Sequence, residues 1–422
     1  MSSSYLGILR LPHARPLLLA SLVGRLSNAT GPLSVVLFVQ ERTGSLAQAG
    51  VSSAAIALGS GLLAPVRGRL VDRYGQRRCL PPMALAFAAA LVGLVAVAGP
   101  GAGAVTATVG LAAAAGAVVP PLGASMRVLW ISMIGQGPRL QTAYALDAVL
   151  DELLFVAGPL LAGGLATLYQ PAAGVLATAG LSVAGTLGFV TSPLSRAQAG
   201  RPAATSGRAG WAGALGGAGL RTLALSLAGV GAAIGIWEIG LVGAAREAGS
   251  AEAASLTLAA WAAASAVGGL WYGSRSWRRP AGQRYLVLLT LLVLACAPMA
   301  AAASSLLALG AVVALVGLVL APLESSAYVL AAELAPPGTL TESGTWMTTA
   351  INVTGAAGLA VAGALVDRVG VSATLAVAGA CAAAGLLVAL AGRDRLGAAP
   401  YRGRHAMSHA TARQLRRERR IF

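Results

Sequence analysis

Three carboxylates stand together at the start of a long apolar segment of the chain. Asp147, Asp151 and Glu152 fall within the stretch DAVLDELLFVAGPLLAGG, residues 147–164, although the whole sequence contains only 14 acidic residues. Asp147 and Asp151 are four positions apart and share one face of a helix, while Glu152 lies about 100° further round. A single ionised carboxylate at mid-membrane costs about 2.5–3.5 kcal/mol on insertion scales. The three acids are therefore expected to need an ionic partner, water or a bound proton.

Arg25, in the first apolar segment, is a candidate partner for these acids. If the acid-bearing segment begins near Gln141, Asp147 lies roughly 9 Å and Asp151 roughly 15 Å along it, about the depth of Arg25. One aspartate could then pair with Arg25, while a second acid, disfavoured as an anion by its neighbour's charge, could bind and release a proton. The alternatives are a purely structural ion pair that fixes helix packing and a misplaced span boundary.

The elements that must position these residues are membrane-spanning helices. The chain has 57% hydrophobic and 10% charged residues, whereas soluble domains carry about 25% charged residues. A helix needs about 20 mostly apolar residues to cross a bilayer, and such segments recur along nearly the whole chain. The pattern predicts an all-α polytopic membrane protein with twelve spans at 16–40, 46–66, 79–99, 103–127, 141–168, 171–192, 221–244, 251–273, 285–304, 306–330, 342–366 and 371–391.

The distribution of arginine predicts the orientation of these spans. The chain contains no lysine, and its formal net charge is +16. Nearly all arginines fall in alternate loops and in the two ends of the chain, whereas the opposite side receives only Arg42, Arg246 and Arg368. Because cytoplasmic loops are enriched in basic residues, we expect a multi-pass plasma-membrane protein with both termini in the cytoplasm. The alanine- and arginine-rich composition also suggests a bacterial source.

The spans divide six and six around a Ser/Gly/Pro/Arg-rich stretch. An offset of 201 residues carries Gly68 onto Gly269, PLGAS at 121–125 onto PLESS at 322–326, and Asp151 onto Asn352. One offset that aligns three separate places indicates a duplicated unit, and carriers commonly place their site between such repeats. The tail is expected to lie on anionic lipids. The predicted organisation is an N-terminal six-helix bundle (1–192), a cytoplasmic linker (193–220), a C-terminal six-helix bundle (221–392) and a basic tail (393–422).

The stretch GRLVDRYGQRR, residues 68–78, resembles motif A of the major facilitator superfamily. Gly68 would let two helix ends approach closely, and Gly75 would close a tight turn. Asp72 could hold an arginine or cap a helix N-terminus in the other half. The resemblance implies two six-helix bundles related by pseudo-symmetry, with a cluster that latches the outward-open state; the alternative is that its arginines only keep the loop in the cytoplasm. The expected latch residues are Gly68, Asp72, Arg73, Gly75, Arg77, Arg78 and Arg127, with Arg73, Arg77 or Arg127 as partners of Asp72.

The stretch FVAGPLLAGG on the fifth span resembles the antiporter motif of the superfamily's drug/proton exporters. The resemblance is carried by Gly158, Pro159, Gly163 and Gly164. In this superfamily spans one and five are neighbours, which implies that Arg25 lies beside Asp147 or Asp151. The sequence departs from the exporters in two places. Gly273 stands where the second half would repeat the motif A acid, and the fourth span carries Arg127 at its expected cytoplasmic end rather than at mid-membrane.

The resemblance also implies which residues face the substrate. Spans one, four, seven and ten line the central cavity in this superfamily, so the acids Glu238 and Glu324 could contact substrate or protons, with structural hydrogen bonding as the alternative. A mostly apolar lining with a few acids suits a hydrophobic solute, including a cationic one, better than a sugar. The expected cavity residues are Asn28, Trp237, Glu238, Glu324, Tyr328 and Asn352.

The leading hypothesis is a secondary active transporter that couples proton entry to efflux of small, largely hydrophobic molecules. An importer or facilitator without proton coupling is the main alternative, and a non-transporting receptor or scaffold is a third. We expect no enzyme activity, cofactor or metal, because the chain has no phosphate-binding glycine loop and no metal-ligand spacing. Nucleic-acid binding is not expected, since no reading element accompanies the basic charge. The protein is expected to function as a monomer.

Overall fold

The computed structural model describes residues 5–198, 200 and 213–397, and its regular elements in these ranges are helices. The N-terminal half comprises α1 (Tyr5–Leu9), α2 (Ala14–Thr43), α3 (Leu46–Tyr74), α4 (Gln76–Val97), α5 (Ala102–Val118), α6 (Leu122–Ile134), α7 (Pro138–Leu168), α8 (Pro171–Thr191) and α9 (Pro193–Ala197). The C-terminal half comprises η1 (Gly213–Gly216), α11 (Ala218–Glu247), α12 (Ala251–Ser274), α13 (Ala281–Cys296), α14 (Met299–Ala302), α15 (Leu306–Leu334), α16 (Leu340–Ala391) and α17 (Arg393–Leu396).

The described helices account for the twelve expected crossings. Ten helical stretches are long and apolar enough to span a membrane, with α5 joined to α6 and α13 joined to α14 as single stretches. The 52-residue α16 contains two crossings that meet at Gly370, whose φ of 83° breaks the helix. The 24-residue α12 lies where the eighth span is expected. The predicted fold class, two six-helix bundles of a polytopic membrane protein, is confirmed.

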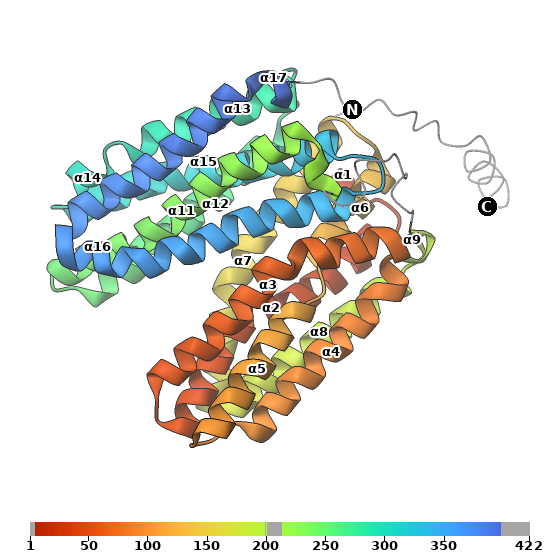
Figure 1. Ribbon diagram of the computed structural model, residues 1–422. Coiled ribbons are helices and arrows are strands. Elements are labelled where there is room, and N and C mark those ends of the chain that lie inside the picture. Colours follow the sequence, from red (N-terminus) through yellow and green to blue (C-terminus); the bar gives the residue numbers. More distant parts are fainter. Residues whose placement is uncertain (1–4, 199, 201–212, 398–422) are drawn as a thin grey trace.

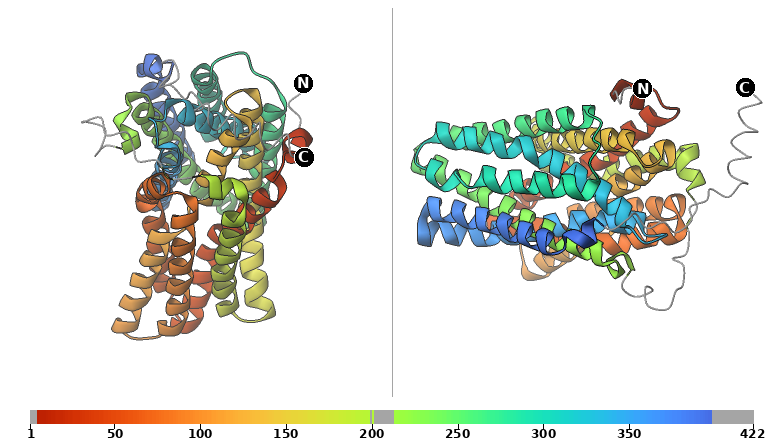
Figure 2. Two further views of the ribbon diagram at one scale, coloured as in Figure 1. Left: turned by 90° about the vertical axis from the view of Figure 1, so that its right-hand side faces the viewer. Right: turned by 90° about the horizontal axis from the view of Figure 1, so that it is seen from above.

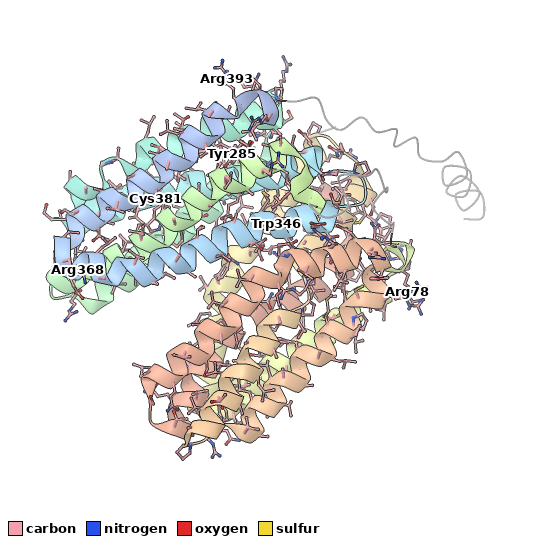
Figure 3. The ribbon with its side chains drawn as sticks, viewed as in Figure 1. Arg78, Tyr285, Trp346, Arg368, Cys381 and Arg393 are labelled. Carbon is pink, nitrogen blue, oxygen red and sulfur yellow. The ribbon has the colours of Figure 1, made fainter. Side chains whose placement is uncertain are left out.

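The two halves form separate bundles that converge at one end and diverge at the other (Figure 1). The side view in Figure 2 shows the C-terminal bundle above the N-terminal bundle. Arg78 and Arg393 lie near the end that carries α1 and α17, whereas Arg368 lies at the opposite end of the C-terminal bundle (Figure 3). We call these the terminal end and the distal end. The bundles touch toward the terminal end.

Close backbone contact joins the first and last crossing of each bundle. A Cβ atom on Gly185 of α8 would overlap the backbone nitrogen of Gly24 on α2. In the other half, a Cβ on Gly229 of α11 would lie 2.8 Å from the Cα of Gly385 on α16. Helices in lipid gain van der Waals contact when small residues let their backbones approach. These glycines therefore let the corresponding pair of crossings in each bundle pack closely.

The segments outside the bundles are partly described. Helix α9 and the 3₁₀ turn η1 fall within the expected linker, and α17 begins the expected tail. Residues 199 and 201–212 of that linker, and 398–422 of that tail, lie outside the described residues. At the other end of the chain, α1 reaches across to the C-terminal bundle, where the Tyr5 hydroxyl donates a hydrogen bond to the Leu270 carbonyl at 2.6 Å.

Candidate functional site

Helix α7 begins before the expected start of the fifth span, so the three carboxylates lie further along their helix than the sequence indicated. Its first turn starts at Pro138, where the missing proline N–H costs no helical hydrogen bond. Counted from Pro138, Asp147 lies about 14 Å and Asp151 about 20 Å along the helix axis. Asp147 is fully buried, while the side chain of Asp151 is 33% exposed. The two aspartates thus share a helix face but differ in their access to solvent.

Two arginines and the two aspartates form a closed set of ion pairs, which we call the charge cluster. Arg25 on α2 places Nη1 2.7 Å from Asp147 Oδ1 and places Nη2 against Asp151 Oδ1. Arg127 on α6 places Nε 3.1 Å from Asp147 Oδ2 and Nη2 3.3 Å from Asp151 Oδ2. The expected pairing of Arg25 with an aspartate of the fifth span is therefore present, and it involves both aspartates. The cluster balances two positive against two negative charges.

The position expected for Arg127 was wrong. The sequence placed it at the cytoplasmic end of its span and in the latch, but α6 starts after the Pro120–Pro121 break and continues to Ile134. Arg127 therefore lies about two turns inside the helix, and its side chain is only 11% exposed. Its guanidinium also lies 3.6 Å from the ring centroid of Tyr328, a residue of the other bundle.

Three further acids surround the charge cluster without an ion pair among the described residues. Glu152 accepts a hydrogen bond from the Ser265 hydroxyl of α12 at 3.1 Å. Glu152 lies within electrostatic range of Glu238 on α11 and of Glu324 on α15. Glu324 is also close enough to be influenced by Asp151 and Arg127. Carboxyl groups from both bundles thus lie near one another beside a cluster whose charges are balanced.

Of the other residues expected to line the cavity, three are at least partly accessible and one is buried. Asn28 and Asn352 are exposed, and Tyr328 is partly buried with its hydroxyl 3.1 Å from the Thr348 hydroxyl. Trp237 was wrongly expected at the lining. It is 1% exposed, and its ring packs edge-on against Trp261 with 6.1 Å between ring centroids. An apolar helix gives no sequence signal for which face its tryptophan turns to neighbouring helices.

Asp72 joins the two bundles at the terminal end. Its carboxylate accepts hydrogen bonds from the backbone N–H groups of Thr341 (3.0 Å) and Glu342 (2.9 Å), in the first turn of α16. An anion at a helix N-terminus satisfies free N–H groups and interacts favourably with the helix dipole. Gly68 permits this approach, because a Cβ there would lie 2.8 Å from the Cα of Glu342. Of the two arrangements expected for Asp72, the structure has the helix cap.

The arginines expected to pair with Asp72 lie elsewhere. Arg73, Arg77 and Arg78 are exposed, and Arg127 belongs to the charge cluster. Gly75, with φ of 89°, forms the turn between α3 and α4. Within the described ranges, no ion pair involves Asp72.

Sequence reasoning missed two latch residues, Arg69 and Glu342. Arg69 Nη2 lies 2.7 Å from Glu342 Oε1, and Glu342 is buried. The same carboxylate oxygen accepts the backbone N–H of Ala214 in η1 at 3.0 Å. Asp72, Arg69 and Glu342, which we call the latch, therefore connect α3, α16 and the end of the linker.

The internal repeat could have revealed a second set of polar contacts between the two bundles. Gln141, in the first turns of α7, stands 201 residues before Glu342. Its amide donates to the Ser325 hydroxyl at 2.6 Å and accepts from Arg284 at 2.8 Å, both in the other bundle. Corresponding positions of the two repeats thus make polar contacts between the bundles. Gly273, which replaces the acid of the first half, packs against Tyr5 and Ala145 instead.

The antiporter-like stretch has one close helix contact. A Cβ on Gly158 would lie 2.5 Å from the backbone carbon of Ala29 on α2, so Gly158 lets α7 approach α2. Pro159 lies inside α7. Gly163 and Gly164 would meet no atom within 4 Å. The structure therefore gives a packing reason for Gly158, and none for the glycine pair.

Comparisons with known proteins identify the fold. No protein-family model matches the sequence, and no curated protein matches it either. Among solved structures, a bacterial homologue of the iron transporter ferroportin in an outward-facing state is similar at 15% identity, with a TM-score of 0.68 over 92% of this chain and 98% of that chain. The human organic anion transporter MFSD10 is similar at 15% identity, with a TM-score of 0.64 over 90% of this chain and 99% of that chain. The Escherichia coli fucose:proton symporter is similar at 14% identity, with a TM-score of 0.68 over 91% of this chain and 98% of that chain. The chain therefore has the major facilitator fold.

Proposed function

We propose that this protein is a secondary active transporter that couples proton movement to the efflux of small, largely hydrophobic molecules across the plasma membrane. In this proposal both termini lie in the cytoplasm, so the terminal end is cytoplasmic and the state described here is open to the outside. The protein acts as a monomer, and its basic tail contacts anionic lipids. The fold supports transport by alternating access, because transporters of three different substrates share it.

The observation that carries the proposal is the unequal environment of the two aspartates. Asp147 is enclosed between Arg25 and Arg127, whereas Asp151 makes its ion pairs while one third of its side chain remains exposed. A carboxylate that reaches solvent beside a buried counter-charge can gain or lose a proton without dismantling the cluster. Asp151 is therefore our candidate for the exchanging group, and Asp147 for the permanent counter-ion.

The extra acids support the substrate class. Glu152, Glu238 and Glu324 bring carboxyl groups from both bundles, and no ion pair among the described residues involves them. Most of the surrounding helix surface is apolar. A hydrophobic molecule, especially a cationic one, would find complementary charge and apolar contact there. Export in exchange for protons would follow if cation and proton compete for these acids.

The test uses the purified full-length protein in proteoliposomes that contain a pH-sensitive dye. Hydrophobic compounds, cationic and neutral, would first be screened for those that raise the thermal unfolding midpoint, since a ligand stabilises the folded state it binds. With an acidic interior imposed, we expect a compound selected in this way to accumulate while protons leave. Asp151→Asn should abolish the accumulation, and Asp367→Asn, which removes an exposed acid at the distal end, should not.

Two results would contradict the proposal, and a third would contradict the assignment of Asp151. Flux that does not depend on the imposed gradient in the wild-type protein would favour a facilitator with structural ion pairs. Movement of the compound in the same direction as protons would favour a symporter. If Asp151→Asn keeps gradient-driven accumulation at the wild-type rate, the assignment of Asp151 is wrong.

A further inference from the structure

One contact links the charge cluster of the N-terminal bundle directly to the C-terminal bundle. The guanidinium carbon of Arg127 lies 3.6 Å from the centroid of the Tyr328 ring. A cation within about 6 Å of an aromatic face is attracted by the ring quadrupole, and the attraction strengthens when both groups are removed from water. Arg127 therefore holds two aspartates of its own bundle while it rests on an aromatic ring of the other.

The guanidinium of Arg127 is held by its ion pairs with Asp147 and Asp151 and by the ring of Tyr328. The backbone of Arg127 is fixed by the Tyr144 hydroxyl, which donates to its carbonyl at 3.2 Å. The side chain of Arg127 also borders a cavity of about 20 Å³, and Tyr328 is one of the walls of that cavity. The ring therefore adds to the two ion pairs in fixing the guanidinium.

The ring itself is held by the C-terminal bundle. Tyr328 lies on α15, and its hydroxyl is 3.1 Å from the hydroxyl of Thr348 on α16. When the terminal ends of the bundles separate, Tyr328 must move away with α15 and α16. The contact with Arg127 can therefore exist only while the terminal end is closed.

From this geometry we propose that Tyr328 is a positioning residue that acts through Arg127 on Asp151. Its ring keeps the guanidinium in ion-pair geometry with the aspartates when the terminal end is closed, and releases it when the end opens. The charge cluster is then complete in one conformation only. This proposal rests on the proposed function, because it describes how the site for the exchanging proton changes between states.

Several charged or titratable groups face Asp151 besides Arg127. These groups are Arg25 on α2, Asp147 and Glu152 on α7, and Glu324 and Tyr328 on α15. Arg25 stays with its own bundle in every state, because α2 and α7 pack together within it. Arg127 is different, since part of its support comes from the opposite bundle. The conformational dependence therefore enters the site through Arg127.

The test measures the distance between spin labels at the distal end, without gradient or substrate. Labels replace Glu41 and Glu247, which are exposed near the distal ends of α2 and α11, in a variant whose three cysteines are changed to alanine. Pulsed electron resonance then gives the ratio of distally open to distally closed molecules. Tyr328→Leu should lower that ratio by about tenfold, and Tyr328→Phe, which keeps the ring, should leave it near the wild-type value.

A double-variant cycle separates positioning from a merely structural role. If Tyr328 acts on Asp151 through Arg127, the fold-change in the ratio for the double variant will differ from the product of the fold-changes for Tyr328→Leu and Asp151→Asn. Independent effects, or equal losses in the Phe and Leu variants, would overturn the proposal. Because the measurement needs no transport, this failure is distinct from failure of proton coupling, which would appear as gradient-independent flux in the wild-type protein.

Discussion

Removal of the negative charge of Asp72 should open the terminal end of the molecule. In the closed arrangement its carboxylate accepts two backbone hydrogen bonds from the first turn of α16, at 3.0 and 2.9 Å. Asp72→Asn keeps the shape of the side chain. Its amide group offers one oxygen acceptor, and its NH₂ cannot accept the second N–H.

The size of the effect follows from these contacts. A net hydrogen bond to a charged group contributes about 1.5–3 kcal/mol, and the charge at the helix N-terminus adds about 0.3–1 kcal/mol. Loss of one bond and of the charge should therefore cost the closed arrangement about 2–4 kcal/mol. Since about 1.4 kcal/mol corresponds to a factor of ten, the population with an open terminal end should rise roughly 30- to 700-fold.

The assay is maleimide labelling of Thr345→Cys in a background without the native cysteines. Thr345 is 3% exposed and lies against Gly68, so a cysteine there can react only when α3 and α16 separate. The labelling rate should rise by the factor given above in Asp72→Asn, and it should be unchanged in the control Asp367→Asn. An unchanged or slower rate in Asp72→Asn would show that the cap does not hold the bundles together.

Two further predictions concern stability, measured as the thermal unfolding midpoint in detergent. Asp147→Asn should lower the midpoint much more than Asp151→Asn. Unpairing a buried charge costs about 3–5 kcal/mol, whereas a partly exposed ion pair contributes about 1 kcal/mol or less. A larger loss in Asp151→Asn would contradict the assigned burial of the two aspartates. Gly185→Val should also destabilise, by about 1–3 kcal/mol or more, because its side chain would overlap the backbone of α2 at Gly24. Gly180→Val on the same helix, where a Cβ meets no atom within 4 Å, is the matched control, and equal midpoints in both valine variants would refute the packing argument.

Much of the fold was predictable because membrane crossings leave a strong signal in hydropathy and arginine distribution. The pairing of Arg25 with the aspartates was also predictable, from depth counted along two helices at 1.5 Å per residue together with the neighbouring first and fifth spans that the resemblance implies. The cap by Asp72 was one of two expected arrangements. Whether Asp72 pairs with an arginine or caps a helix depends on where the first turn of α16 lies. The sequence of α3 gives no information about that position.

The features that were missed depend on helix boundaries and on which face a helix turns to its neighbours. Arg127 was misplaced because α6 continues to Ile134, so a residue expected at an end lies inside. Trp237 was assigned to the lining because hydrophobic helices carry little amphipathic signal. Glu342 was missed because a single acid at a helix start has many uses, although its offset from Gln141 matches the internal repeat.

The glycine contacts within each bundle limit how the molecule can move. Interlocking side chains can change rotamer and let two helices slide, but Gly24–Gly185 and Gly229–Gly385 meet through their main chains and have nothing to rearrange. Each half is thus stiff across its first and last crossings. A displacement at one end of a bundle must therefore tilt the whole bundle as a rigid body. A small movement near the contact between the bundles then produces a larger movement at the far end.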